Sequence, residues 1–309
     1  MRPVLLAVLL LGCSESSPSG TTPAATDAGA KDTGIAPEDY VFGGDRPVPF
    51  FRAPEGADPK TPMPLVVVLH GFGASGLMQA IYLKLDKLVN EKKFLLVAPD
   101  GTPDKDAKRF WNAVDTCCDF DGTKVDDVKY LTGLVDEIAS VWAVDRKRVY
   151  LAGHSNGGAM SYRLACDAAP TFAAAWVLAP PFYADMTKCK PSAAVSIRHV
   201  HGTADETVDY AGGPSKTGGL ATAFPSARAT VEAWAKWNGC AATADESAAP
   251  IDFDLGVPGA ETKIAKWPSC RDGVATELWS LEGSTHIPMK LSPDLGQSIW
   301  SFFEQHPRK

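Results

Sequence analysis

The run Gly153-His154-Ser155-Asn156-Gly157 is the feature that most constrains how this chain folds. It stands between an apolar, strand-like segment at 148–152 and a segment at 157–167 with helical patterning. A sharp strand-to-helix turn brings the residues two before and two after its serine close together, and glycine at both places relieves the crowding. Such a turn exposes the serine hydroxyl at the end of a strand. The run therefore predicts a strand–turn–helix unit that presents Ser155 as a nucleophile.

Strand-like and helix-like segments alternate on both sides of this turn. Strand-like segments lie at 64–70, 94–98, 148–152, 174–178, 193–200, 263–267 and 274–281, and helix-like segments at 77–92, 126–141, 157–167, 227–237 and 295–305. The segment at 64–70 (PLVVVLH) is apolar at nearly every position, as in a strand that is buried on both faces. The alternation predicts an α/β fold, a mainly parallel sheet flanked by helices on both faces, in a single domain over residues 39–309.

The segment before that domain has the composition of an export signal and a tether. Residues 1–13 (MRPVLLAVLLLGC) carry an apolar run that is too short to cross a bilayer, which takes about 20 residues. The run ends at Cys13 in a sequence that resembles a bacterial lipobox, which predicts lipidation of Cys13 after cleavage; an ordinary secretory signal is the alternative. We expect export, with the anchor as the only membrane contact and with Ser14 favouring the outer membrane. Residues 14–38 are rich in Ser, Thr, Pro and Ala and predict a flexible tether.

The remaining cysteines suggest disulfides, as expected for an exported chain. An even number is left when Cys13 is set aside, and sequence alone leaves every pairing open. We predict the pairs Cys166 with Cys189 and Cys240 with Cys270, since each closes a short excursion, and this leaves Cys117 to pair with Cys118. No CxxC pair occurs and no histidine lies near a cysteine at ligand spacing, so we expect no metal.

The charge of the chain bears on its partners. A net charge of -7 and a pI near 5.4 argue against nucleic-acid binding, which needs a basic surface. A small-molecule substrate or a neutral polymer such as a polysaccharide fits better, and we expect a monomer.

Acyl transfer needs a nucleophile, a base, a group that orients the base, and donors for the oxyanion. In folds with this turn the acid follows the serine in the chain and the histidine comes last. Asp205, which follows the segment at 193–200, fits the acid, with Asp209 as its nearest rival, and His286 fits the base. The other histidines match the base less well: His201 precedes a glycine in a turn, and His199 lies within a strand.

Other positions near these strand ends are candidates for binding. The turn His70-Gly71-Phe72-Gly73 follows the first buried strand, where the backbone amide of Phe72 is expected to bind the oxyanion together with that of Asn156. Trp111 is a candidate substrate contact, although an equally good interpretation makes it a buried anchor of its loop. His154, next to the nucleophile, is a second candidate contact.

Several of these motifs can be matched together to one family. They are VVVLHGFGAS, the paired cysteines before VDDVKYL, LAGHSNGGAM, HVHGTADETVDY and LEGSTHIP, spread over about residues 40–305. The set resembles the polyhydroxybutyrate depolymerase-like, feruloyl and acetylxylan esterases, a secreted group of α/β-hydrolases. The resemblance implies Ser155, Asp205 and His286 as a catalytic triad, and hydrolysis of carboxylic esters without metal or organic cofactor.

Two departures from that family affect the expected substrate. Many members have Gly-Gly-His-x-Trp-Pro around the histidine, whereas this chain has Ser284-Thr285-His286-Ile287-Pro288, which predicts a different acyl pocket. No separate polymer-binding domain is recognisable, so soluble feruloyl, acetyl or short 3-hydroxyacyl esters are the expected substrates. A serine peptidase on the same scaffold and a non-catalytic surface-binding lipoprotein are the alternative functions.

Overall fold

The structure is a computed structural model that describes residues 36–214 and 223–309. The expected signal segment with Cys13, and the expected tether up to residue 35, lie outside the described residues. Within the described ranges, no helix is long and apolar enough to cross a membrane.

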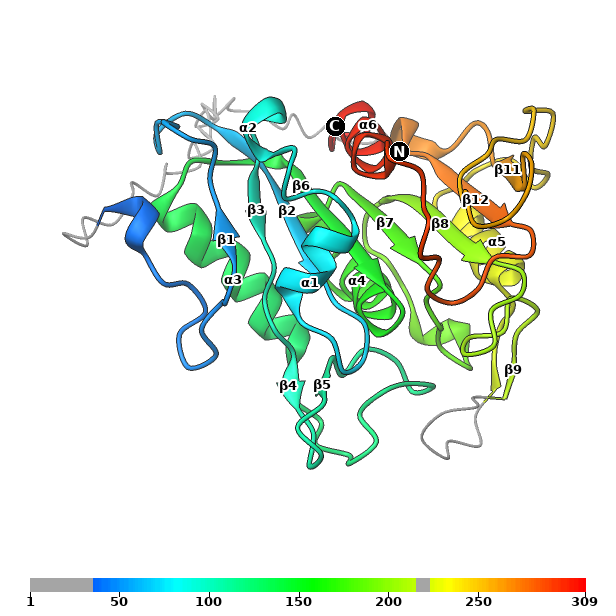
Figure 1. The fold of residues 1–309 in the computed structure, drawn as a ribbon, viewed down its shortest axis with the longest axis horizontal. Helices are drawn as coiled ribbons and strands as arrows, with labels where there is room; N and C mark the ends of the chain where they lie inside the picture. The colour runs from blue at the N-terminus through cyan, green and yellow to red at the C-terminus, as the bar shows by residue number, and fades with distance from the viewer. Residues whose placement is uncertain (1–35, 215–222) are drawn as a thin grey trace, which may run out of the picture.

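An eight-stranded, mostly parallel sheet forms the centre of the fold (Figure 1). Its strands lie in the order β1, β3, β2, β6, β7, β8, β12, β11. Their bounds are Phe51–Arg52 (β1), Leu95–Val97 (β3), Met63–Leu69 (β2), Val144–His154 (β6), Ala174–Leu178 (β7), Ser196–Gly202 (β8), Thr276–Leu281 (β12) and Thr262–Lys266 (β11). The inner strands run parallel to one another, while β1 and β11 are antiparallel to their neighbours. The predicted parallel sheet is confirmed.

Helices cover both faces of this sheet (Figure 1). They are α1 (Gly76–Tyr82), α2 (Val89–Lys92), α3 (Asp127–Val141), α4 (Asn156–Asp167), α5 (Ala227–Trp237) and α6 (Leu295–Gln305). Along β2, Leu65, Val67 and Leu69 face the core that contains α3 and α4. Val66 and Val68 face the opposite core, with α1 and α6. Because both sets are fully buried, the continuous apolar run of this strand is explained.

Smaller elements complete the chain. Two small antiparallel sheets pair β4 (Thr102–Pro103) with β5 (Arg109–Phe110) and β9 (Gly213–Pro214) with β10 (Ala223–Phe224). Single turns of 3-10 helix lie at Pro37–Asp39, Ala169–Thr171, Met186–Lys188 and Arg271–Gly273. The cysteines form the three pairs that the sequence suggested, Cys117–Cys118, Cys166–Cys189 and Cys240–Cys270.

The single helix predicted at 77–92 is wrong, because the structure divides it into α1 and α2. The chain leaves the helix after Tyr82, and Lys84 has a left-handed backbone with φ of 57°. The Lys84 ammonium donates to the carbonyl oxygens of Leu291 and Ser292, and the start of α6 packs directly on this turn. A tertiary contact from the far end of the chain therefore overrides the local helical pattern.

The carboxyl ends of the parallel strands share one edge of the sheet, at the bottom of Figure 1. β8 continues two residues beyond the predicted strand, because His201 pairs with Ser280 and Gly202 with Leu281 of β12. The turns that carry Phe72, Ser155, Asp205 and His286 follow β2, β6, β8 and β12. Residues far apart in the sequence thereby meet at the edge where open α/β sheets bind ligands.

Candidate active site

The turn between β6 and α4 holds Ser155 in an unusual backbone conformation, with φ of 53° and ψ of -121°. Two close approaches make this turn possible. A Cβ on Gly153 would lie 2.4 Å from the carbonyl oxygen of Gly157, and a Cβ on Gly157 would lie 2.1 Å from that of Leu69. Any side chain at either position would collide with backbone. The glycines that the sequence singled out are therefore required by packing around the serine.

Three side chains from separate turns form a hydrogen-bonded row at this edge. The Nδ1–H of His286 donates to Asp205 Oδ2 at 2.6 Å, and His286 Nε2 lies 2.9 Å from Ser155 Oγ. Because a carboxylate only accepts, the imidazole proton is on Nδ1, and Nε2 accepts the serine O–H. The amide of Ala204 also donates to the carbonyl oxygen of Ser284 at 3.0 Å, which joins the turn of the aspartate to that of the histidine.

Asp205 is held as an anion. Burial acts to raise the pKa of its carboxyl group, but the hydrogen bonds from His201 and His286 outweigh burial and hold the pKa well below its usual value. Oδ1 accepts the backbone amides of Thr207 and Val208, both at 2.8 Å. Asp209, the rival acid, accepts the amide of Ala211 within its own turn and is not part of the row.

His154 lies beside Ser155 but points toward the turn of His286. Its Nε2 is 2.9 Å from the carbonyl oxygen of His286, and since a carbonyl only accepts, this nitrogen donates. Burial, followed by the neighbouring His286, lowers the pKa of His154 to about 3, so the ring is neutral at pH 7. The side chain is nearly buried and still reaches the wall of the cavity above the serine.

The turn after β2 is supported from below by Trp111. The backbone N–H and C=O of Trp111 pair with the side-chain amide of Asn156, at 2.7 and 2.9 Å, and its indole N–H donates to the carbonyl oxygen of His70. Trp111 is fully buried and is not among the residues that line the cavity, a position that favours the loop-anchor interpretation. A Cβ on Gly71 would lie 3.4 Å from Ser155 Cβ, so the turn that carries Phe72 passes close to the serine.

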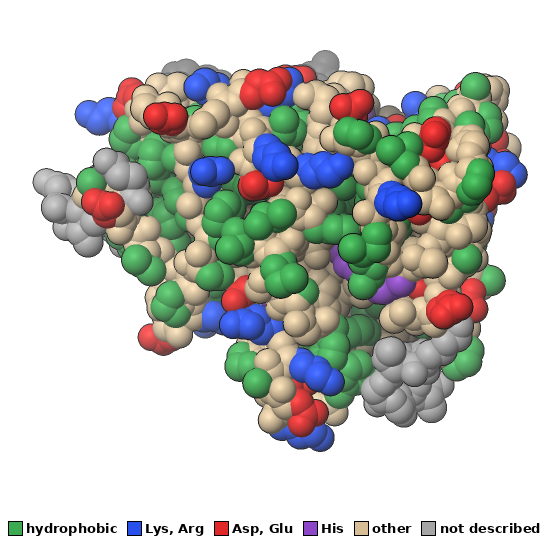
Figure 2. All heavy atoms as spheres, viewed as in Figure 1, with side chains coloured by type: hydrophobic (Ala, Val, Ile, Leu, Met, Phe, Trp, Pro, Cys, Tyr) green, Lys and Arg blue, Asp and Glu red, His purple; other side chains and the backbone are tan. Residues whose placement is uncertain are grey.

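A cavity of about 770 Å³ opens above Ser155. Figure 2 shows histidine side chains in a hollow bordered by hydrophobic side chains. Apolar parts of the wall come from Phe72, Phe120, Val208 and Ile287, and the rings of Phe72 and Phe120 meet edge to face at 5.4 Å. The Cys117–Cys118 disulfide also lines the cavity, and charged residues of the β4–β5 hairpin form its rim: Asp104, Lys105, Asp106 and Lys108.

The sequence did not indicate Phe120 or Val208 as cavity residues, because Phe120 belongs to no motif and Val208, although inside HVHGTADETVDY, has no polar group that marks a role. The sequence places His199 in a strand and His201 in a turn; in the structure His201 Nε2 lies 3.2 Å from Asp205 Oδ2, and His199 is hydrogen-bonded to His201. Their spacing of two residues along a strand was the signal that they share a face.

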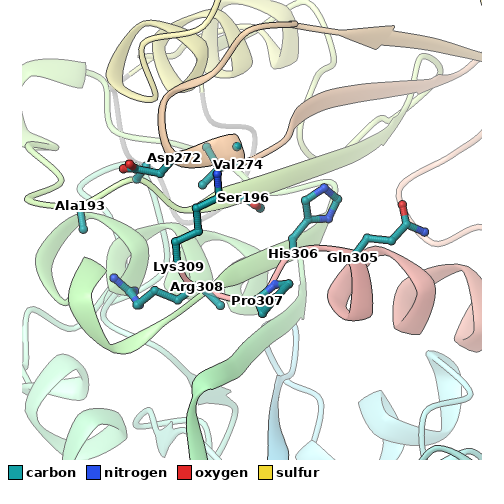
Figure 3. Close-up of a pocket in the computed structure, with 12 residues that line it drawn as sticks. Ala193, Ser196, Asp272, Val274, Gln305, His306, Pro307, Arg308 and Lys309 are labelled. Atoms are coloured by element: carbon teal, nitrogen blue, oxygen red, sulfur yellow. The ribbon is translucent and has the colours of Figure 1, made fainter.

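A second cavity, about 380 Å³, lies at the opposite edge of the sheet, near the amino ends of β7 and β8 (Figure 3). It is lined by the C-terminal tail with His306 and Arg308, and it contains no part of the hydrogen-bonded row. In residues 36–214 and 223–309, no group of three or more His, Cys, Asp or Glu side chains could hold a metal ion.

The sheet order, the strained serine turn and the row at the strand ends together define a protein of the α/β-hydrolase fold. Residues 50–213 match the model of a family described as esterase PHB depolymerase, and the chain belongs to this family. The solved acetyl xylan esterase from Aspergillus awamori has the same fold, with a TM-score of 0.55 and 15% identity over 82% of this chain and 93% of its own.

Two curated relatives are similar in sequence. Feruloyl esterase B of Piromyces equi is 33% identical over 202 residues, which cover 63% of this chain and 33% of that protein. A bifunctional acetylxylan esterase/xylanase of Neocallimastix patriciarum is 27% identical over 258 residues, 82% of this chain and 32% of that protein. The chain thus spans about a third of the length of these two relatives.

Proposed function

We propose that this protein is a serine esterase that hydrolyses carboxylic esters through an acyl-enzyme. The observation that carries the proposal is the row from Ser155 Oγ through His286 to Asp205, at 2.9 and 2.6 Å, at the floor of the large cavity. Membership of an esterase family supports it.

In this mechanism Ser155 Oγ attacks the ester carbonyl while His286 Nε2 takes its proton. Asp205 holds the imidazole by its Nδ1–H and stabilises the imidazolium that forms. The backbone amides of Phe72 and Asn156 bind the oxyanion, aided by the positive end of the α4 dipole. His286 then gives its proton to the departing alcohol. Water, activated by the same nitrogen, releases the acid and restores the serine.

For the substrate we propose feruloyl, acetyl or short 3-hydroxyacyl esters. The aromatic and aliphatic wall formed by Phe72, Phe120, Val208 and Ile287 is suited to an aryl or short acyl group. The charged rim on the β4–β5 hairpin suits the polar alcohol side, such as a sugar of a polysaccharide. The names of the two curated relatives, a feruloyl esterase and an acetylxylan esterase, point to the same substrates.

We further propose that the protein is exported and anchored to the cell envelope by a lipid on Cys13. Support comes from the apolar run that ends at this cysteine and from the three disulfides, which are characteristic of oxidising compartments. Mass spectrometry of the mature N-terminus tests it: an unmodified N-terminus, or a Cys13→Ser variant that stays with the membrane fraction, would contradict the anchor.

The esterase proposal is tested with nitrophenyl acetate, nitrophenyl butyrate and methyl ferulate. Ser155→Ala is expected to lose activity on all three and to resist labelling by a fluorophosphonate probe. Ser140→Ala is the matched control, because its hydroxyl bonds to the carbonyl oxygen of Glu137 on α3, away from the cavity. Equal activity of the two variants would refute the proposal.

A further inference from the structure

Hydrogen bonds continue from Asp205 into the core through two further imidazoles. Tyr162 Oη of α4 lies 2.7 Å from His199 Nδ1, and His199 Nε2 lies 2.9 Å from His201 Nδ1. His201 Nε2 lies 2.8 Å from the carbonyl oxygen of Val208 and 3.2 Å from Asp205 Oδ2. Tyr162, His199 and His201 are at most 1% exposed. This chain of side chains is not used by the mechanism above.

The partners at its two ends fix the position of every proton in the chain. Both neighbours of His201 Nε2 are acceptors, so this nitrogen carries hydrogen. Burial keeps the pKa of His199 well below its usual value, and the ring is neutral. Within residues 36–214 and 223–309, the Tyr162 hydroxyl has His199 Nδ1 as its one hydrogen-bond partner. If the Tyr162 oxygen instead accepted a proton from His199 Nδ1, the buried O–H of the tyrosine would have no acceptor, and an unpaired buried donor costs free energy.

It follows that Tyr162 donates to His199, His199 to His201, and His201 toward Asp205. Each imidazole is protonated on Nε2 and bare on Nδ1. All donors point the same way, and the chain ends on the loop that carries the proposed catalytic acid. A ring flip or tautomer change at either histidine would place two donors, or two acceptors, against each other in a site without water access.

We propose that His199 and His201 are positioning residues for the reaction, which lock the loop 205–208 and thereby the Asp205 carboxylate in the orientation that His286 requires. Backbone amides already hold Oδ1, and the His201 N–H lies between the Val208 carbonyl and Oδ2. Asp205 is thus held on both oxygens by its own loop and by strand β8. The inference rests on the proposed esterase function, since the orientation of Asp205 affects turnover only through His286.

Three substitutions at His201 separate positioning from packing. His201→Phe keeps the ring volume and removes every polar contact. His201→Gln places an amide donor where Nε2 stands, and His201→Asn places its amide where Nδ1 stands, without reaching the loop. We expect kcat for nitrophenyl butyrate to fall roughly 10- to 100-fold in the Phe and Asn variants, as for loss of a hydrogen bond to a charged group, with KM within about twofold. The Gln variant is expected to recover most of kcat.

Two outcomes of these kinetics would overturn the proposal. One is equal kcat in the Gln and Asn variants, which would mean that the donor at Nε2 has no role. The other is a rise in KM that accounts for the whole loss, which would indicate a distorted cavity. Circular dichroism confirms that each compared variant is folded.

A second measurement needs no activity. Imidazole ¹⁵N chemical shifts of the ¹⁵N-histidine-labelled protein, assigned with the Phe variants, report which nitrogen carries the proton. We expect protonated Nε2 and bare Nδ1 on His199 and His201, and mixed tautomers at His199 in Tyr162→Phe, with kcat about threefold lower. Tyr150→Phe is the matched control, because this buried hydroxyl has no hydrogen-bond partner in the described part of the chain.

Protonated Nδ1 on His201, or identical behaviour of the two tyrosine variants, would overturn the inference. The esterase function is decided separately by Ser155→Ala, so failure of one proposal does not carry over to the other.

Discussion

Replacing Asp205 by asparagine tests the proposed mechanism at its most tightly bound side chain. The carboxylate faces donors on both oxygens: the amides of Thr207 and Val208 on Oδ1, and the rings of His201 and His286 on Oδ2. An asparagine must turn its NH2 toward one of these sets.

The backbone amides cannot change from donor to acceptor, so the asparagine oxygen is expected to stay with them. Its NH2 then faces His286 Nδ1, which must become an acceptor, and the ring proton moves to Nε2. A protonated Nε2 cannot take the hydroxyl proton of Ser155. In serine proteases, the same change of the triad acid to an amide costs about 10⁴ in kcat, or about 5.4 kcal/mol in the barrier. We expect a loss of this order.

The assay is hydrolysis of nitrophenyl butyrate at pH 7 by Asp205→Asn and Asp209→Asn. Asp209→Asn is the matched control, because Asp209 lies four residues away and bonds within its own turn. Its kcat is expected to stay within about twofold of the parent protein, because asparagine keeps the side-chain oxygen that accepts the amide of Ala211. A loss of less than about tenfold in Asp205→Asn, with the protein folded, would refute the tautomer argument.

Three further predictions concern stability. The pKa of His154 in the folded protein is about 3, so below pH 6.5 the unfolded chain binds more protons than the folded one. We therefore expect the free energy of unfolding, measured with urea, to decrease steadily as the pH falls from about 6.5 toward 3. The decrease should be less steep in His154→Gln. Gly157→Ala would place a Cβ 2.1 Å from a backbone oxygen of β2 and should lower the melting temperature and abolish activity. Gly133→Ala is the control, because a Cβ at this position in α3 would meet no atom within 4 Å; it should raise the free energy of unfolding by about 0.5–1 kcal/mol. Replacing both Cys166 and Cys189 by serine removes a disulfide that joins residues 23 apart in the sequence. The free energy of unfolding, measured by thermal denaturation, should fall by about 3 kcal/mol.

The sequence predicted those parts of the site that depend on backbone contacts between neighbouring elements. Gly153 and Gly157 are visible in the sequence because no other residue fits where the turn approaches β2 and itself. The order of the serine, the acid and the histidine follows from the order of the strands in the chain. Asp205 could be proposed as the acid from sequence even though β8 ends two residues later than expected, because a residue in this role needs only to follow the strand.

Features that depend on tertiary contacts were not predictable in this way. The break between α1 and α2 is caused by contacts of Lys84 with the segment before α6, far along the chain. Trp111 carries no local mark that separates a buried anchor from a substrate contact, since its burial depends on Asn156 and His70. The contact behind the proposed role of His199 forms only because α4 brings Tyr162 onto β8.

The proposed chemistry and the substrate preference depend on different parts of the fold. The hydrogen-bonded row is fixed by strand ends and by backbone amides, so it tolerates little change. The cavity wall instead comes from four separate loops, represented by Phe72, Phe120, Val208 and Ile287, and these apolar side chains form no hydrogen bond with the row. Loop side chains can therefore change the accepted ester while the row keeps its geometry, which is why the sequence defines the proposed reaction more sharply than the substrate.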